Sequence, residues 1–257
     1  MNLFDIYLHL QSLSPICISL ISFFFIVFIR DRLALISNEV VYKSIGVVGI
    51  PVHEVSHFIV CLACMPFGYR VQELQLYKPS AQETAGHVLY TYKKSLFSPI
   101  LNLMIGIAPL FGGTIAFVLV TKWLMPDVFN YFASTVNFKN ALNGDLSASY
   151  HHLANLLGFI IFSSSGFIKT LCWLFLSYSL IVFSVPSKAD LTGSKLGVLL
   201  LIIFVLLLST VWPSAYVDLM SYFTQFNTIY IAMALLHFVL YLVTLSCYYS
   251  IDLLRAR

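Results

Sequence analysis

The sequence predicts an all-α integral membrane protein with about six transmembrane helices and a small membrane-associated β hairpin or sheet between the second and third. Hydrophobic residues make up 60% of its 257 residues and charged residues only 10%, whereas a soluble domain carries about 25% charged residues. Six apolar segments approach or exceed the length that crosses a bilayer, and one polar segment alternates as a strand does. Residues 1–257 therefore form a single integral membrane domain in this prediction.

The six spans follow from apolar runs, because a spanning helix needs about 20 mainly apolar residues. The third is the clearest, since no charged residue lies between Ser95 and Thr121. The fourth carries Lys169 near its start, where a long side chain can reach the interface. The first fifteen residues lack Lys and Arg, so we expect the first span to be retained rather than cleaved as a signal. The predicted spans are residues 12–30, 45–67, 96–121, 166–187, 195–212 and 229–251.

Two connections between the spans are unusual. In residues 69–94, the stretch VQELQLY alternates and GHVLYTY is rich in β-forming residues, with turn residues between them. This pattern predicts a hairpin or small sheet, either re-entrant or cytoplasmic. Residues 122–165 form a long extracytoplasmic loop in the prediction, with room for a short interfacial helix.

Positive residues in short loops predict which side of the membrane is cytoplasmic. Under a six-span arrangement, three connections and ends fall on one side and carry most of these residues. They are Arg70, Lys78, Lys93, Lys94, Lys188, Lys195, Arg255 and Arg257. Arg30, Arg32 and Lys43 fall on the other side and oppose this orientation. The net charge of +3 is small and scattered, so we expect no nucleic-acid partner.

The second span contains the sequence His53-Glu54-Val55-Ser56-His57, an H-E-x-x-H pattern. On an α-helix, residues four apart lie on one face about one turn apart, so the two imidazoles can bind one metal ion. In a soluble helix such residues simply face water, but polar side chains at membrane depth are costly and point to function. A buried polar network without metal, such as a proton relay, is the alternative.

Glu54 lies about 100° around the helix from His53, close enough to reach a metal-bound water. Zn²⁺ lowers the pKa of its water to about 7 and polarises a carbonyl. Glu54 can then act as the general base that takes the proton of the water and returns it to the leaving amine. This combination predicts peptide hydrolysis, with Zn²⁺ as the cofactor.

A catalytic zinc site needs a third protein ligand and an open position. Asp190 is the best candidate, because it is a carboxylate at the end of an apolar span that Pro186 interrupts. The alternative for Asp190 is that it caps the next helix. The other candidates for the third ligand are His87, Asp145, His151, His152, Cys61 and Cys64.

Residues 45–195 resemble the site-2 protease family of intramembrane zinc metalloproteases. The resemblance rests on H-E-x-x-H in a membrane helix, a β-rich segment with Gly-x-Val, a further span and a late Asp motif. In that family the third ligand is the Asp of N-P-x-P-x-L-D-G, and the matching stretch here is 185–191, VPSKADL. The resemblance implies that His53, His57 and Asp190 bind the zinc. The stretch lacks the Asn of the family motif, and no Gly follows its Asp.

The β-rich segment and the third span contain candidate substrate-binding residues. In such enzymes an exposed strand edge can take up an unwound substrate as an added strand. Residues 85–92 are the candidate edge, with Gly86, His87 and Val88 at its start; an ordinary re-entrant hairpin is the alternative. Asn102 is placed to orient a ligand or a substrate carbonyl, or to join helices by hydrogen bonds.

The sequence thus predicts an intramembrane zinc metalloprotease that cuts membrane-anchored protein substrates. The first alternative is a catalytically inactive metal-binding scaffold or partner subunit. The second is a transporter or proton channel, which should show two related halves with broken helices; we find no such repeat. The expected location is a bacterial inner membrane or another cell membrane, crossed several times. The sequence leaves the oligomeric state open.

Overall fold

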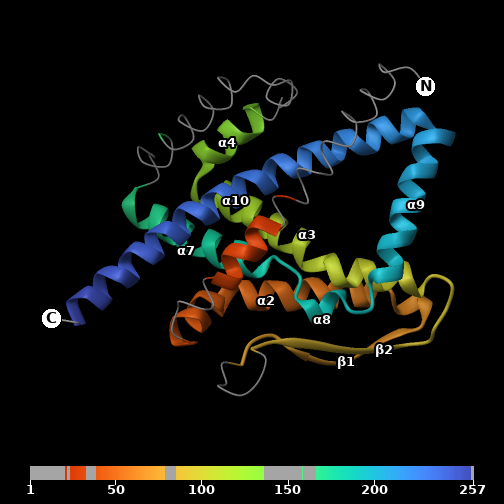
Figure 1. The fold of residues 1–257 in the computed structure, drawn as a ribbon, viewed down its shortest axis with the longest axis horizontal. Coiled ribbons are helices and arrows are strands. Elements are labelled where there is room, and N and C mark those ends of the chain that lie inside the picture. The colour runs from red at the N-terminus through yellow and green to blue at the C-terminus, as the bar shows by residue number, and fades with distance from the viewer. Residues whose placement is uncertain are drawn as a thin grey trace.

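The computed structural model describes residues 21, 24–32, 39–78, 85–135, 158 and 166–255. It is mostly helical, with one two-stranded antiparallel sheet, which confirms the predicted fold class in outline. Residues 24–32 are also helical. The labelled elements in chain order (Figure 1) are α2 (Glu39–Ala63), the 3₁₀ turn η1 (Met65–Phe67), β1 (Tyr69–Gln75), β2 (His87–Tyr92), α3 (Ser98–Leu124), α4 (Pro126–Thr135), α7 (Phe167–Phe183), α8 (Lys188–Leu191), α9 (Lys195–Val211) and α10 (Pro213–Arg255).

Within the described parts of the chain, two helices are long and apolar enough to cross a membrane: Tyr42–Ala63 within α2, and α3. They correspond to the second and third predicted spans. The apolar helices α7 and α9 have 17 residues each, shorter than the roughly 20 that a span ordinarily needs. The predicted span 12–30 lies mostly outside the described residues. The structure therefore supports two of the six predicted spans by length and composition.

The predicted spans 195–212 and 229–251 imply a loop at residues 213–228. This prediction is wrong, because α10 is one continuous helix of 43 residues that begins at Pro213. Pro213 occupies its first turn, where a missing N–H costs nothing. From Ser214 to Arg255 the sequence has no Gly or Pro, so nothing interrupts the helix after it has begun. The start of the predicted loop 122–165 is also helical, in α4, and most of the rest of that loop lies outside the described residues.

The core forms where α2, α3 and α7 pack together (Figure 1). Trp173 of α7 is fully buried, and its ring N–H donates to the hydroxyl of Thr121 in α3 at 3.0 Å. The backbone N–H of Gly49 in α2 donates to the hydroxyl of Ser179 in α7 at 2.8 Å. That hydroxyl in turn donates to the carbonyl of Ile45. These contacts place α7 directly against the helix that carries the H-E-x-x-H motif.

The hairpin lies along α2 rather than beyond its end (Figure 1). Strand β1 begins just after α2 and η1, and Tyr77 donates a hydrogen bond from its hydroxyl to the carbonyl of Lys43, near the start of α2. Arg70 and Lys78 therefore lie near opposite ends of strand β1, whereas the predicted orientation assigns both to the cytoplasmic side. Arg30 was assigned to the side opposite Lys188, yet it donates to the carbonyl of Val185, close to Lys188 in sequence.

A test of the α2–α7 packing is Gly49→Ala. A Cβ at this position would collide with the backbone carbonyl of Ser179, which cannot move without shifting α7. We expect a loss of roughly 2 kcal/mol in unfolding free energy, typical of an overpacked core. The matched control is Gly46→Ala, where the new Cβ meets the ends of the Ile50 and Phe183 side chains. Thermal unfolding in detergent should show a lower midpoint for Gly49→Ala than for Gly46→Ala; equal midpoints would contradict the packing.

Candidate metal centre

Three side chains from two distant segments meet at one point. The Nε2 atoms of His53 and His57 lie 3.1 Å apart, one helical turn from each other on α2. The carboxylate of Asp190, in α8, lies 3.3 Å from each of these nitrogens, one oxygen toward each ring. One ligand atom from each of the three residues falls within 4.8 Å of the others. The structure thus brings together the three residues that the sequence predicts as metal ligands.

The other ring nitrogen of each histidine fixes its tautomer. His53 Nδ1 is 2.7 Å from the carbonyl oxygen of Phe183, and His57 Nδ1 is 2.7 Å from that of Ile105. A carbonyl only accepts hydrogen bonds, so each neutral imidazole carries its proton on Nδ1 and presents a bare lone pair at Nε2. This arrangement, in which the outer nitrogen donates to a backbone carbonyl, is common for metal-binding histidines.

Asp190 is both a helix cap and the third member of the cluster. In α8, Ser187 accepts a hydrogen bond at its hydroxyl from the Asp190 N–H, and its own N–H donates to Asp190 Oδ2 at 2.6 Å. Asp190 thus belongs to the capping box of its own short helix, whose N-cap is Ser187. It does not cap the next helix, α9, because the N-cap of α9 is Ser194, so that alternative is wrong.

The end of α7 supplies partners for two of the three residues. In a helix that continued, the N–H of Ser187 would donate to the carbonyl of Phe183. The helix ends at Phe183 and Pro186 follows, so this bond is not made. The freed carbonyl accepts from His53 and the freed N–H donates to Asp190. One interrupted helical bond thus holds two side chains of the cluster.

This donor set fits a metal ion. When both imidazoles are neutral, two bare nitrogens and an ionised carboxylate converge, and they repel one another unless a cation lies among them. A single shared proton satisfies at most two of these atoms. A divalent ion can accept all three ligands and keep a fourth position open, which is the arrangement of a catalytic zinc site. The group could therefore bind a metal ion, as the sequence predicted.

Glu54 lies beside this cluster in a cavity of about 380 Å³. The residue as a whole is only 7% exposed, and its carboxylate makes no hydrogen bond or ion pair with the residues that the structure describes. The cavity is also lined by His53, His57 and Asp190. Glu54 therefore lies beside the three-residue cluster but is not one of its members.

The start of β2 forms another wall of the same cavity. Gly86, His87 and Val88, predicted as substrate-binding residues, all line it. A side chain at Gly86 would meet the Cγ of Glu54, so the absence of one lets the strand approach this close. The Nε2 of His87 lies 3.5 Å from a carboxylate oxygen of Glu73 on β1 and is outside the three-residue cluster.

Asn102 does not line this cavity. Its side-chain oxygen accepts from the hydroxyl of Tyr69 at 2.8 Å, and its amide donates to the hydroxyl of Tyr92 at 3.0 Å. Its backbone carbonyl accepts from Ser194, whose hydroxyl also lies 3.4 Å from the carbonyl of Asp190. Of the two sequence alternatives for Asn102, the structure shows the joining role: it connects the hairpin and α3, close to the segment that carries Asp190.

Several partners in the centre were not identified from the sequence. The carbonyls of Phe183 and Ile105 and the cap residue Ser187 were missed. The Ser-x-x-Asp spacing of 187–190 is a recognisable cap signal that could have found Ser187. Among the other candidate ligands, Cys61 and Cys64 are buried in an apolar cluster. Asp145, His151 and His152 lie outside the described residues.

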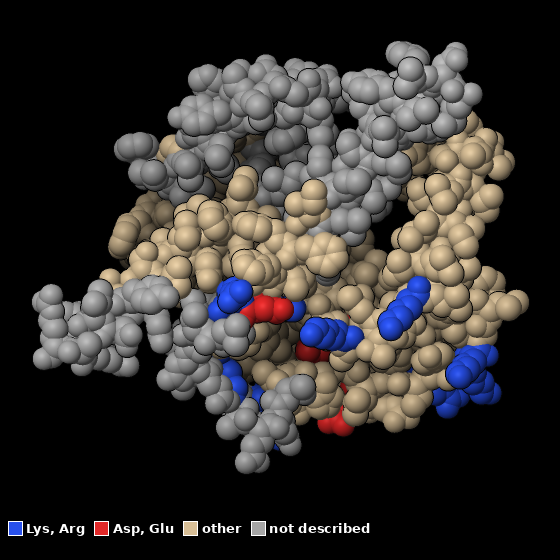
Figure 2. Space-filling view, in the orientation of Figure 1, with Lys and Arg blue, Asp and Glu red and all other residues tan. Residues whose placement is uncertain are grey.

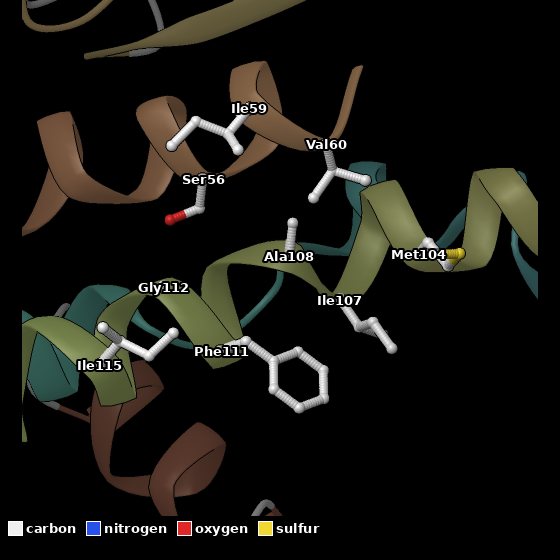
Figure 3. Close-up of a pocket in the computed structure, with 9 residues that line it drawn as sticks. All are labelled: Ser56, Ile59, Val60, Met104, Ile107, Ala108, Phe111, Gly112 and Ile115. Carbon is white, nitrogen blue, oxygen red and sulfur yellow. The ribbon is translucent and has the colours of Figure 1, made fainter. Parts of the chain in front are cut away.

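A second cavity, of about 340 Å³, lies between α2 and α3 (Figure 3). Its lining includes Ser56 and Ile59 of α2 and Met104, Phe111 and Ile115 of α3. None of its lining residues is titratable, so it offers no group for acid–base or metal chemistry. The chemically active groups of α2 lie in the first cavity.

No protein-family model, curated protein or solved structure matches the chain. The geometry of this centre is therefore the basis for the function proposed below.

The metal centre predicts that purified protein carries about one zinc per chain. His53→Ala, His57→Ala and Asp190→Ala should each lower zinc affinity at least tenfold, because two ligands rarely retain zinc. His87→Ala is the matched control, since this imidazole lines the same cavity but lies outside the cluster. Elemental analysis after dialysis measures the metal. Full zinc retention in the His53→Ala, His57→Ala double variant would refute the centre.

Proposed function

We propose that the protein is an intramembrane zinc metalloprotease, similar to the site-2 protease family, that hydrolyses peptide bonds of membrane-anchored substrates. One observation carries the proposal: a buried carboxylate, Glu54, and a three-ligand metal centre share one cavity that is bordered by a β-strand. A metalloprotease needs these elements together. The proposal covers zinc as the metal, proteolysis as the activity and several membrane crossings.

Two imidazoles and one carboxylate with a fourth position open are the ligand set of one class of catalytic zinc site. When bound, it would lower the pKa of its water to about 7 and polarise the substrate carbonyl. The residues of the chain do the rest. His53 and His57 hold their lone pairs toward the metal position because their Nδ1 protons are engaged by carbonyls. Asp190 supplies the negative charge and is held by its own cap.

Glu54 is the general base in this mechanism. It takes the proton from the attacking water and passes it to the leaving amine, so that hydrolysis consumes one water and leaves one new carboxyl and one new amine. Its position also argues against the main alternative, an inactive metal-binding scaffold. Its side chain lines the cavity of the metal centre and is bonded to no other residue that the structure describes, an arrangement that a general base needs and a scaffold does not.

The substrate would bind along β2. A helical peptide shields its own backbone, so a protease that cuts in a membrane must first unwind it. An unwound segment can add to a strand edge, where main-chain hydrogen bonds hold it extended. Gly86, His87 and Val88 border the cavity that contains Glu54. A peptide added beside them would bring its carbonyl groups close to the metal centre.

The surface of the helices supports a location within a membrane. On α3, the exposed side chains Ile100, Met104, Phe111, Ile115 and Leu119 follow one helical face. On α9, nearly every large side chain is apolar and exposed. Figure 2 shows Lys and Arg near the hairpin, α8 and the start of α9, whereas the rest of α9 has no charged residue. An apolar surface of this extent is typical of contact with lipid.

Several crossings are part of the proposal. Helices α7 and α9 are about 25 Å long at 1.5 Å per residue. A hydrocarbon core of about 30 Å can accommodate such a helix by local thinning at modest cost. Helix α7 packs along α2 and α3, whereas α9 runs across the direction of α2 (Figure 1). The proposed crossings α2, α3 and α7 would together place the metal centre inside the bilayer.

The variant Glu54→Gln separates the protease from the scaffold. It keeps the size of the side chain but cannot accept the proton, so zinc and fold should survive while cleavage falls about a hundredfold or more. The measurement compares new protein N-termini in membranes of cells that produce wild-type or variant protein, by terminal labelling and mass spectrometry. Asp218→Asn, at an exposed carboxylate on α10 outside the cavity lining, is the control. If zinc stays bound and both proteins give the same N-termini, the protease proposal fails.

A further inference from the structure

The hydrogen-bond partner of His57 lies in the middle of a helix. The carbonyl of Ile105 belongs to α3, which runs from Ser98 to Leu124. Inside a helix, each carbonyl normally accepts from the N–H four residues later. Such a carbonyl is ordinarily engaged and directed along the helix axis. That this one accepts from an imidazole 2.7 Å away therefore requires an explanation.

The explanation is the residue four positions later, Pro109. Proline has no N–H, so it removes the helical bond that would end on the carbonyl of Ile105. Its ring also crowds that same carbonyl, which tilts away from the axis. Pro109 and Ile105 are both buried in the packed interior. A buried carbonyl without a partner is costly, and the Nδ1–H of His57 supplies the missing donor.

We infer that Pro109 is a positioning residue for the metal centre. By leaving the carbonyl of Ile105 free, it keeps the proton of His57 on Nδ1 and the bare Nε2 directed at His53 and Asp190. The same device holds His53, whose carbonyl partner at Phe183 is free because α7 ends there. Each histidine is thus held by a carbonyl that has lost its helical donor. The inference rests on the metal centre within the proposed function and not on proteolysis.

The competing explanation is that Pro109 only shapes α3. Prolines are tolerated in membrane helices, where neighbours satisfy the freed groups, and the ring alone could set the path of the helix. Replacing proline by alanine changes both the ring and the N–H, so this variant by itself cannot separate the two explanations. The test must restore the N–H in one variant and withhold it in another.

Two variants of the full-length protein do this. Pro109→Ala restores the N–H. Replacement of Pro109 by lactic acid, the α-hydroxy analogue of alanine, gives a backbone ester with the same methyl group but no N–H. The measurements are zinc affinity, by competition with a chelator at fixed pH, and the nitrogen NMR shifts of the His57 ring in metal-free protein. Thermal unfolding in chelator reports whether each variant folds.

We expect Pro109→Ala to lose about 10- to 100-fold in zinc affinity, the usual scale for a lost partner of a metal-binding histidine. Its His57 ring should no longer hold the proton on Nδ1 alone. The ester variant should stay within about threefold of wild type. Equal losses in both variants would show that the ring matters and the N–H does not, which overturns the inference. Unchanged affinity in Pro109→Ala would overturn it as well.

A further variant leaves Pro109 in place, so it remains informative if Pro109→Ala does not accumulate. Replacing Gly106 by glycolic acid turns the carbonyl of Ile105 into an ester carbonyl, which is a weaker acceptor. Zinc affinity should fall several-fold, and an unchanged affinity would contradict the inference. Wild-type protein that binds no zinc would be a different result, because it refutes the metal centre itself and with it the proposed function.

Discussion

The structure depends on one electrostatic constraint: two imidazole nitrogens and a carboxylate, all acceptors, meet at 3.1–3.3 Å. Such a group repels itself in a medium of low dielectric constant, and burial makes the repulsion stronger. Backbone contacts hold each of the three side chains in place. A cation bound among them would remove the repulsion, and for this reason the group could bind a metal ion.

The backbone groups that hold the three side chains lie where a regular helix is interrupted. A regular helix satisfies its own backbone and has nothing to offer a side chain. Here His53, His57 and Asp190 are each held by a backbone group released from a helical bond, at the end of α7 or at a proline. Close packing of α2 against α7, through Gly49 and Ser179, keeps these groups within reach. The helix packing that forms the fold therefore also positions the side chains of the site.

The sequence predicted the parts of the site that depend on local spacing. His53 and His57 are four residues apart on a helix, and Asp190 follows an apolar segment that Pro186 ends. The parts that depend on packing were not predictable in this way. Hydropathy could not show that the hairpin lies along α2, and it divided α10 at a polar stretch that the helix simply continues through. The tyrosine partners of Asn102 are likewise a tertiary result. The carbonyl of Ile105 is predictable in part. Pro109 has no N–H, so the sequence shows that this carbonyl loses its helical donor, but it does not show that His57 replaces the donor.

The separation of the ligands along the chain has a consequence for biosynthesis. His53 and its carbonyl partner Phe183 are 130 residues apart, and Asp190 comes later still. At a translation rate of about 5–20 residues per second, the two histidines leave the ribosome roughly 7 to 26 s before the end of α7 does. During that interval a metal ion would meet the two histidines without Asp190. Tight binding of a metal would therefore have to follow the arrival and packing of α7 and α8, so the metal would be the last component to be added.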